Sequence, residues 1–596
     1  MNRNTWLGTA LGIVSFFLAN APASAQFEPI TLSWLEGPPQ VASGVSWGVP
    51  WPQGKVKKDQ TFQLTGADGT ARPLQSWPLA YWPDGSMKWI GFATVVTPQM
   101  AGPFKLAAGA GAAVDGPKVQ VKTTKQTIEI DTGGMVCKIP AQGGADLFES
   151  IVIRGRTVAA NGRLECISQN GPDVDPALPP AREKFVGNIK KVTVEQSGPV
   201  RAVVKFEGMH KSTTTKREWL PFTVRLYFSA GDTPVRMVHT FFFDGDEKKD
   251  FIRGLGVTFS VPFAEEIQNR HVRLSGEDAG LWAEPIQPLT GYQRSITYPG
   301  GGQVYNDQIA GKRMPNRKDL SAANQQTLDA FAMWDNYRLI QPNAQGFTIE
   351  KQTGPKSSWV IAGAGKRSTG YAFVGDVSGG LGVGVKDFWQ SYPASLEVRR
   401  ARSKAADLRV WLWSPDAPAM DMRHYDTIAH GLNETYEDVE EGFSTPLGIA
   451  RTSSLTLFPK GGLPTKQDTA KQVQTAVKPP WLVCTPAYLH SVKAFGLWSL
   501  QDRSTDFKKG IEDILDGNIA FFQKEVEQRN WYGFWDYGDV MHGYDATRHV
   551  WKYDIGGFAW DNSEQGTDMW LWYSFLRTGR ADIFRMAEAM TRHTGE

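Results

Sequence analysis

Short runs that alternate apolar with polar or small residues fill the middle of the chain. Three of them, Val200 to Phe206, Phe222 to Phe228 and Val235 to Phe243, follow one another at hairpin spacing, with Gly198-Pro199 before the first and Gly231-Asp232 between the last two. An alternation of period two predicts half-buried strands, and this spacing predicts antiparallel pairing. No helical segments alternate with the runs, so a large antiparallel β-sandwich is predicted and a parallel α/β fold is not.

A smaller β-rich segment comes first. Residues 27–105 contain short strand-like runs, and Pro83-Asp84-Gly85 forms a hairpin turn between two aromatic ones. The residues that follow, 107–113, are rich in Gly and Ala and are predicted to be a linker. We therefore place an N-terminal β-barrel at residues 26–115 and the sandwich at residues 116–465.

The hydrophobic period changes after the sandwich. A bridge rich in Pro, Gly and Lys, Pro459 to Pro480, marks the change. Beyond it, apolar residues from Phe507 to Val526 recur at helical spacing, and Ser504 or Thr505 is a suitable N-cap. A long amphipathic helix is predicted here.

Two more helices are predicted over Glu564 to Arg577 and Ala581 to Arg592, joined by Thr578-Gly579-Arg580. Antiparallel helix pairs are the unit of helical bundles and α/α toroids. Residues 466–596 are therefore predicted to be the start of a toroid. Only about one and a half pairs are present, and stacked pairs bury their apolar faces on one another, so we expect this domain to be incomplete.

The N-terminus has the pattern of a secretory signal. Arg3 supplies a positive charge, Trp6 to Leu18 is a short apolar stretch, and Ala23-Ser24-Ala25 is a small-residue cleavage site. Residues 1–25 are predicted to be removed. No later apolar run is long enough to span a membrane, so we expect a secreted or periplasmic protein.

The amino-acid composition limits the classes of molecule that the protein is expected to bind. The formal net charge is only +2, which gives no reason to expect a nucleic acid. Aromatic residues make up 12% of the chain and include 22 Trp, which favours a protein that handles sugars, although large β-sandwich cores use Trp as well. The three cysteines allow at most one disulfide, and Cys137 with Cys166 is the pair expected if one forms. No spacing of metal ligands and no cofactor motif is present.

Residues 531–562 concentrate titratable and aromatic side chains in a run that resembles a loop. Cleavage beside a uronic acid by β-elimination needs a cation on the carboxylate, a base for the C5 proton and an acid for the leaving O4. Arg548 suits the first role, His542 the second, and Tyr544 or Tyr553 the third. These four are the predicted catalytic residues.

Other side chains are predicted to bind the substrate. They are Trp535 and Trp551 for stacking on sugars, Asp539, Asp545 and His549 for orienting groups or binding hydroxyls, and Arg423 with His424 as a groove wall. A glycoside hydrolase would instead pair two carboxylates, Asp539 or Asp545 with Glu564. A carbohydrate-binding protein without catalytic activity is the third alternative.

Several segments resemble the PcRGLX/YetA-like family, which includes exo-rhamnogalacturonan lyases of polysaccharide lyase family 26. The resemblance is carried, in order, by Gly48 to Pro52, Trp82 to Trp89, Phe243 to Asp246, Asp250 to Gly256, Asp387 to Pro393, Trp411 to Pro415, Met420 to Asp426 and most of 531–594. It implies an N-terminal RIFT-type barrel, a central β-sandwich and a C-terminal α/α toroid. It further implies β-elimination at a galacturonate of rhamnogalacturonan-type pectin, with an acidic polysaccharide as partner. Family members continue beyond the point reached here, so the resemblance implies that the chain is truncated within the toroid.

Overall fold

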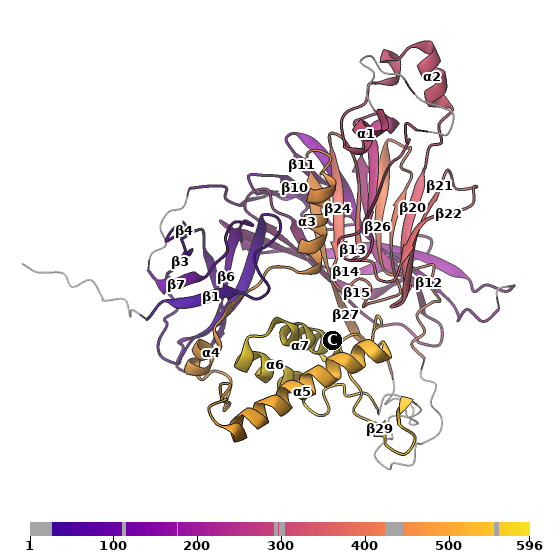
Figure 1. The fold of residues 1–596 in the computed structure, drawn as a ribbon. Helices are drawn as coiled ribbons and strands as arrows, with labels where there is room; N and C mark the ends of the chain where they lie inside the picture. Colours follow the sequence, from indigo (N-terminus) through magenta and orange to yellow (C-terminus); the bar gives the residue numbers. More distant parts are fainter. Residues whose placement is uncertain are drawn as a thin grey trace, which may run out of the picture.

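The computed structural model describes residues 27–109, 115–175, 177–290, 296, 304–423, 445–553 and 559–595. Two β-rich bodies and one helical body lie against one another, and α5 to α7 form most of the helical body (Figure 1). The predicted signal peptide lies outside the described residues. No helix in the described part of the chain is long and apolar enough to cross a membrane.

The N-terminal body consists of two small sheets. One contains, in order, β28 (Leu482–Cys484), β1 (Ile30–Trp34), β7 (Phe104–Ala108), β3 (Phe62–Thr65) and β4 (Ala71–Arg72). The other contains β2 (Ser43–Pro50), β6 (Met87–Val96) and β5 (Gln75–Tyr81). The hairpin predicted around Pro83-Asp84-Gly85 is β5 and β6, which pair antiparallel. β28 arrives from late in the chain and ties the helical body to this barrel.

The central body is a large antiparallel assembly in which β27 pairs with both β16 and β24. Its first ten strands are β8 (Gln120–Thr123), β9 (Thr127–Asp131), β10 (Val136–Pro140), β11 (Ser150–Ile153), β12 (Arg156–Gln169), β13 (Arg182–Ser197), β14 (Arg201–Ser212), β15 (Glu218–Ser229), β16 (Val235–Phe242) and β17 (Phe251–Pro262). The other ten are β18 (Arg270–Ser275), β19 (Leu281–Pro285), β20 (Asn336–Asn343), β21 (Gly346–Gln352), β22 (Val360–Gly365), β23 (Tyr371–Asp376), β24 (Gly379–Val385), β25 (Ala394–Arg399), β26 (Ala405–Trp413) and β27 (Ala450–Lys460). The three runs that the alternation predicted correspond to β14, β15 and β16.

A short helical excursion leaves the sandwich between β19 and β20. It contains α1 (Val304–Ile309), η2 (Arg317–Asp319) and α2 (Ala322–Asp329), and it projects at the top of Figure 1. η1 (Ile267–Asn269) lies at its base, where Asn269 exchanges two hydrogen bonds with the backbone of Met314. The sequence did not predict this excursion.

Cys137 and Cys166, the pair expected if a disulfide formed, are both free and buried in the core. The bridge predicted over Pro459 to Pro480 contains a helix, α3 (Lys466–Val477), because its apolar side chains find a partner surface. Val473 and Ala476 of α3 pack with aromatic residues of β23 and β27.

The helical body contains α4 (Pro486–Val492), α5 (Asp506–Arg529), α6 (Thr567–Thr578) and α7 (Ala581–Thr594). The prediction of a long helix capped by Thr505 is confirmed, since the Thr505 side chain accepts a hydrogen bond from the Lys508 amide. Its predicted apolar face is only partly covered. Phe522 and Val526 pack against the core of this body, whereas Phe507 is 78% exposed within the described chain.

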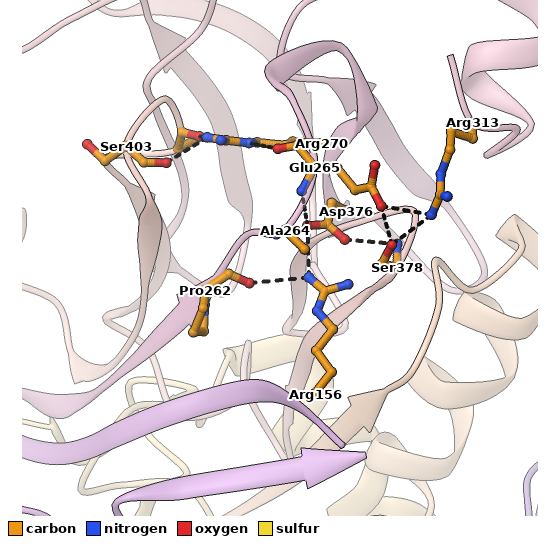
Figure 2. Close-up of polar contacts among 10 residues, drawn as sticks. Arg156, Pro262, Ala264, Glu265, Arg270, Arg313, Asp376, Ser378 and Ser403 are labelled. Atoms are coloured by element: carbon orange, nitrogen blue, oxygen red, sulfur yellow. Dashed lines mark hydrogen bonds and ion pairs between the residues drawn. The ribbon is translucent and has the colours of Figure 1, made fainter. Parts of the chain in front are cut away.

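Asp376, the last residue of β23, is completely buried at the edge of the sandwich. Figure 2 shows how its carboxylate is held by donors from three segments. It accepts hydrogen bonds from Arg156 Nη2 at 2.8 Å, the Ala264 amide at 2.7 Å and the Ser378 amide at 2.8 Å. Arg156 belongs to β12 and Ala264 follows β17, so one carboxylate fixes three strands.

We expect Asp376→Asn to lower the free energy of unfolding by about 2 kcal/mol. The neutral amide keeps the shape of the side chain but presents an NH₂ to donors and leaves the charge of Arg156 without its counterion. Urea unfolding monitored by fluorescence measures the loss. The matched control is Asp329→Asn, which breaks the exposed ion pair with Arg317 and should have a much smaller effect on stability. Equal losses in the two variants would contradict this account of Asp376.

Candidate functional site

A small, positively charged pocket lies between the sandwich and α7. It has a volume of about 60 Å³, enough for a carboxylate and a few waters but not for a sugar ring. Four cationic side chains line it: Arg236 of β16, Lys386 after β24, Arg451 of β27 and Arg592 of α7. The pairing of β16 with β27 brings the first and third together from distant parts of the chain.

The anionic side chains in this pocket are both held by Lys386. Its Nζ lies 2.6 Å from Asp387 Oδ2 and 3.3 Å from Glu588 Oε2. Burial would raise the pKa of Glu588, but Lys386 and Arg585 outweigh it and hold that pKa below its ordinary value. Among the described residues, the lining contains four cationic side chains and two carboxylates.

The arginines are positioned by hydroxyls and rings. Arg451 donates from Nη2 to Ser391 Oγ at 3.2 Å, and its guanidinium lies 5.6 Å from the ring centroid of Phe534. Arg236 donates from Nε to Ser454 Oγ at 3.2 Å, and burial lowers the pKa of this guanidinium. A planar guanidinium binds a carboxylate in two places, so this set suits an acidic group on a ligand.

Tyr537 separates this pocket from a second, larger one. The second pocket has a volume of about 220 Å³ and is lined by Trp389, Tyr532 and Met586, among others. The rings of Trp389 and Tyr532 lie 4.8 Å apart at an edge-to-face angle. A charged pocket beside an aromatic one matches the two ends of an acidic sugar, its carboxylate and its C–H face.

Tyr537 and Asp387 carry the titratable chemistry of the site. Burial raises the pKa of Tyr537 well above its ordinary value, and the nearby negative charge of Asp387 adds to the rise. Tyr537 is therefore protonated at neutral pH and can donate a proton. Asp387 has a left-handed backbone conformation with φ of 56°. Residues other than Gly adopt it uncommonly, and such residues are often found at functional sites.

The predicted catalytic residues lie elsewhere, around a small hairpin of β29 (Tyr544–Asp545) and β30 (Val550–Trp551). Arg548 Nε forms an exposed ion pair with Asp545 at 2.6 Å, and the backbone and side-chain hydrogen bonds of Arg548 lower the pKa of Asp545 to about 2. His542 Nε2 lies 3.4 Å from Glu564 Oε2. The lining of the charged pocket includes none of the four predicted catalytic residues, His542, Tyr544, Arg548 and Tyr553. Their catalytic role stays a prediction.

The aromatic residues of this hairpin have mainly a packing role. Tyr553 is half exposed, and its hydroxyl accepts a hydrogen bond from Trp531 Nε1 at 3.0 Å. Tyr544 lies edge-on to Trp551. Trp551 is 6% exposed and donates from Nε1 to Glu525, so its ring lacks the free face that stacking on a sugar would require. The stacking role predicted for Trp551 is not supported. His549 is exposed in a left-handed turn.

Asp539 positions His593, which was not among the site residues predicted from the sequence. It is 2% exposed, and its Oδ2 lies 3.2 Å from Nε2 of His593 on α7. His593 Nδ1 faces the Trp535 carbonyl oxygen at 2.7 Å. Burial would lower the pKa of His593, but Asp539 outweighs it and raises that pKa. Both ring nitrogens face acceptors, and these contacts join the end of α7 to the segment of Trp535. The place of His593 in a regular helical pattern gave no signal of this role.

Two predicted groove residues remain, Arg423 and His424, and the structure describes only the first. Arg423 forms an ion pair with Asp421 at 2.8 Å and lies over the ring of Phe251, away from the charged pocket. His424 lies outside the described residues. In the described part of the chain, no group of three or more His, Cys, Asp or Glu side chains is arranged to hold a metal ion.

Comparisons with known proteins account for the whole described fold. Residues 28–109 match the model of the PcRGLX-like N-terminal RIFT barrel domain, residues 119–474 the PcRGLX-like protein central beta sandwich domain, and residues 479–596 the PcRGLX-like protein C-terminal alpha/alpha toroid domain. The predicted order of barrel, sandwich and toroid is therefore confirmed.

One curated relative is the uncharacterised protein YetA of Bacillus subtilis (strain 168), which is 40% identical over 570 residues. The match covers 95% of this chain and 65% of the relative, so the chain spans about two thirds of the relative's length. Among solved structures, a glycosyl hydrolase family 38 protein from Enterococcus faecalis has 12% identity and a TM-score of 0.42, covering 78% of this chain and 48% of that one. A galactose mutarotase-like protein from Lactobacillus casei has 10% identity and a TM-score of 0.24, covering 56% and 100%.

Proposed function

Because this chain belongs to the family of PcRGLX-like proteins, we propose that it is an exported polysaccharide lyase that cleaves rhamnogalacturonan-type pectin beside a galacturonate. The observation that carries the proposal is the pocket of Arg236, Lys386, Arg451 and Arg592 beside Tyr537. Its charge fits a uronate carboxylate, which neutral polysaccharides lack. The signal-like pattern of residues 1–25 supports export.

In the proposed reaction, the carboxylate of the galacturonate enters the charged pocket. Arg451 and Arg592 stabilise the negative charge that grows on it as the C5 proton leaves. Asp387 accepts that proton, because its described ion pair is with Lys386 alone, whereas Glu588 is paired with both Lys386 and Arg585. The electron pair forms the C4–C5 double bond, the C4–O4 bond breaks, and Tyr537 protonates O4. The sugar ring itself lies in the pocket of Trp389 and Tyr532.

The test is a rise in absorbance from the unsaturated uronate during incubation with rhamnogalacturonan. Tyr537→Phe should lower the rate about a hundredfold, because the leaving oxygen loses its proton donor. Tyr305→Phe, on the surface of α1, is the matched control and should leave the rate unchanged.

Two further variants separate the pocket from the hairpin. His542→Ala and Arg548→Ala test the catalytic residues predicted from sequence. If they abolish the absorbance change while Tyr537→Phe does not, catalysis belongs to the hairpin and the pocket assignment is overturned. New reducing ends without any absorbance change would mean hydrolysis and would overturn the lyase proposal.

A further inference from the structure

A second positively charged pocket lies where the N-terminal barrel meets the sandwich. It has a volume of about 90 Å³ and is lined by Ser46 of β2, Arg201 of β14, Tyr227 of β15 and Arg236 of β16, with Trp481 at its rim. The described lining includes no Asp or Glu. Nothing in the proposed elimination uses this pocket.

Arg201 is held in place by neutral groups. It donates from Nη1 to Ser46 Oγ at 2.6 Å and from Nε to Gln196 Oε1 at 2.9 Å, and it stacks on Trp77 at 4.0 Å from the ring centroid. Only 8% of the residue is exposed. Burial lowers the pKa of Arg201 to about 10, which still leaves it charged at neutral pH. Burying a cation without a counterion costs free energy, so an anion bound beside Arg201 would be stabilising.

Arg236 connects this pocket to the first, because it lines both. The two guanidinium groups lie near the same ring, Arg201 at 5.6 Å and Arg236 at 5.7 Å from the centroid of Tyr227. No described carboxylate lies within ion-pair distance of either one: the neighbouring Glu195 is paired with Arg225. The charged surface thus continues from α7 across the sandwich toward the barrel.

We propose that this second pocket binds a further carboxylate of the same acidic polysaccharide. The inference rests on the proposed function, since it extends the site for one uronate into a site for two. Two carboxylates bound along one chain would raise affinity for the polymer over a single uronate and set which glycosidic bond faces Tyr537. The N-terminal barrel contributes to this subsite through Ser46.

Ser46→Asp tests the proposal without removing the arginine. The new carboxylate would pair with Arg201 and occupy its charge, so the fold is kept while the subsite is neutralised. Ser46→Asn is the matched control, since it has the same size and no charge. Arg201→Gln is a third variant, checked for folding by its melting temperature.

Calorimetry measures binding of galacturonate, of inorganic phosphate and of a rhamnogalacturonan oligosaccharide with several galacturonates. The wild type should bind the oligosaccharide at least about tenfold more tightly than galacturonate, and Ser46→Asp and Arg201→Gln should remove that advantage while Ser46→Asn keeps it. An unchanged advantage in Ser46→Asp, or its equal loss in Ser46→Asn, would overturn the proposal. So would phosphate binding that equals oligosaccharide binding. Loss of the advantage without bond cleavage by the wild type would support the subsite and count against the lyase.

Discussion

Arg451→Gln is expected to lower the rate of uronate elimination by about a hundredfold to a thousandfold. Arg451 lies in the charged pocket, donates to Ser391 and is 7% exposed, so its charge acts in a site with little water to screen it. The negative charge on the substrate carboxylate grows in the transition state. The loss should therefore be larger in kcat than in KM.

Two companion variants give this prediction its controls. Arg451→Lys keeps the charge but loses the planar fork, so its rate should fall between those of the wild type and Arg451→Gln. Arg400→Gln removes an exposed arginine of the same sandwich, paired with Asp407, and should leave the rate unchanged. Initial rates of the absorbance change measure all three. Equal kcat in Arg451→Gln and the wild type would contradict the role given to this residue.

The sequence predicts the strands well because the alternation that specifies each strand lies within that strand. Alternation in Phe222 to Phe228 depends only on neighbouring residues, and the same holds for the helical spacing in α7. The helix α3 was missed because its apolar residues are few, and it is stabilised by packing on β23 and β27. Tertiary contact overrides local propensity at such places.

The charged pocket could not be predicted in this way. Arg236 and Arg451 are each single cations in strands whose register only the fold reveals, and Arg592 comes from a helix that packs beside them. The density of aromatic and titratable groups around Trp551 instead led to the prediction of a catalytic site at the hairpin. In the structure much of that density is the core of the helical body, where Trp531 and Trp551 meet at 5.1 Å.

Three buried histidines predict a steep loss of stability in acid. His210, His239 and His271 are each at most 3% exposed and all belong to the sandwich. Burial lowers their pKa values from the ordinary 6.5 to about 4 for His210 and about 3 for His239 and His271. His239 has no hydrogen-bond partner on either ring nitrogen in the described chain, so nothing near it would stabilise the charged form.

The direction of the pH effect on stability follows from the number of protons that the folded and unfolded states bind. Between pH 6.5 and pH 4 the unfolded chain binds protons on these histidines and the folded chain does not. Stability is therefore complete above pH 6.5 and falls as the pH is lowered toward the folded-state values. Each histidine contributes about 1.4 kcal/mol per pH unit, so the three together contribute roughly 4 kcal/mol per unit.

His239→Gln isolates one share of this slope, because glutamine does not titrate. Free energies of unfolding from urea titrations between pH 6 and pH 4.5, measured for the wild type and the variant, should diverge by about 1.4 kcal/mol per pH unit, the wild type losing more. A constant offset between the two proteins reports only packing and does not affect the slope. Parallel curves for His239→Gln and the wild type would mean that His239 is already charged in the folded protein, which its dry, partnerless position in the sandwich argues against.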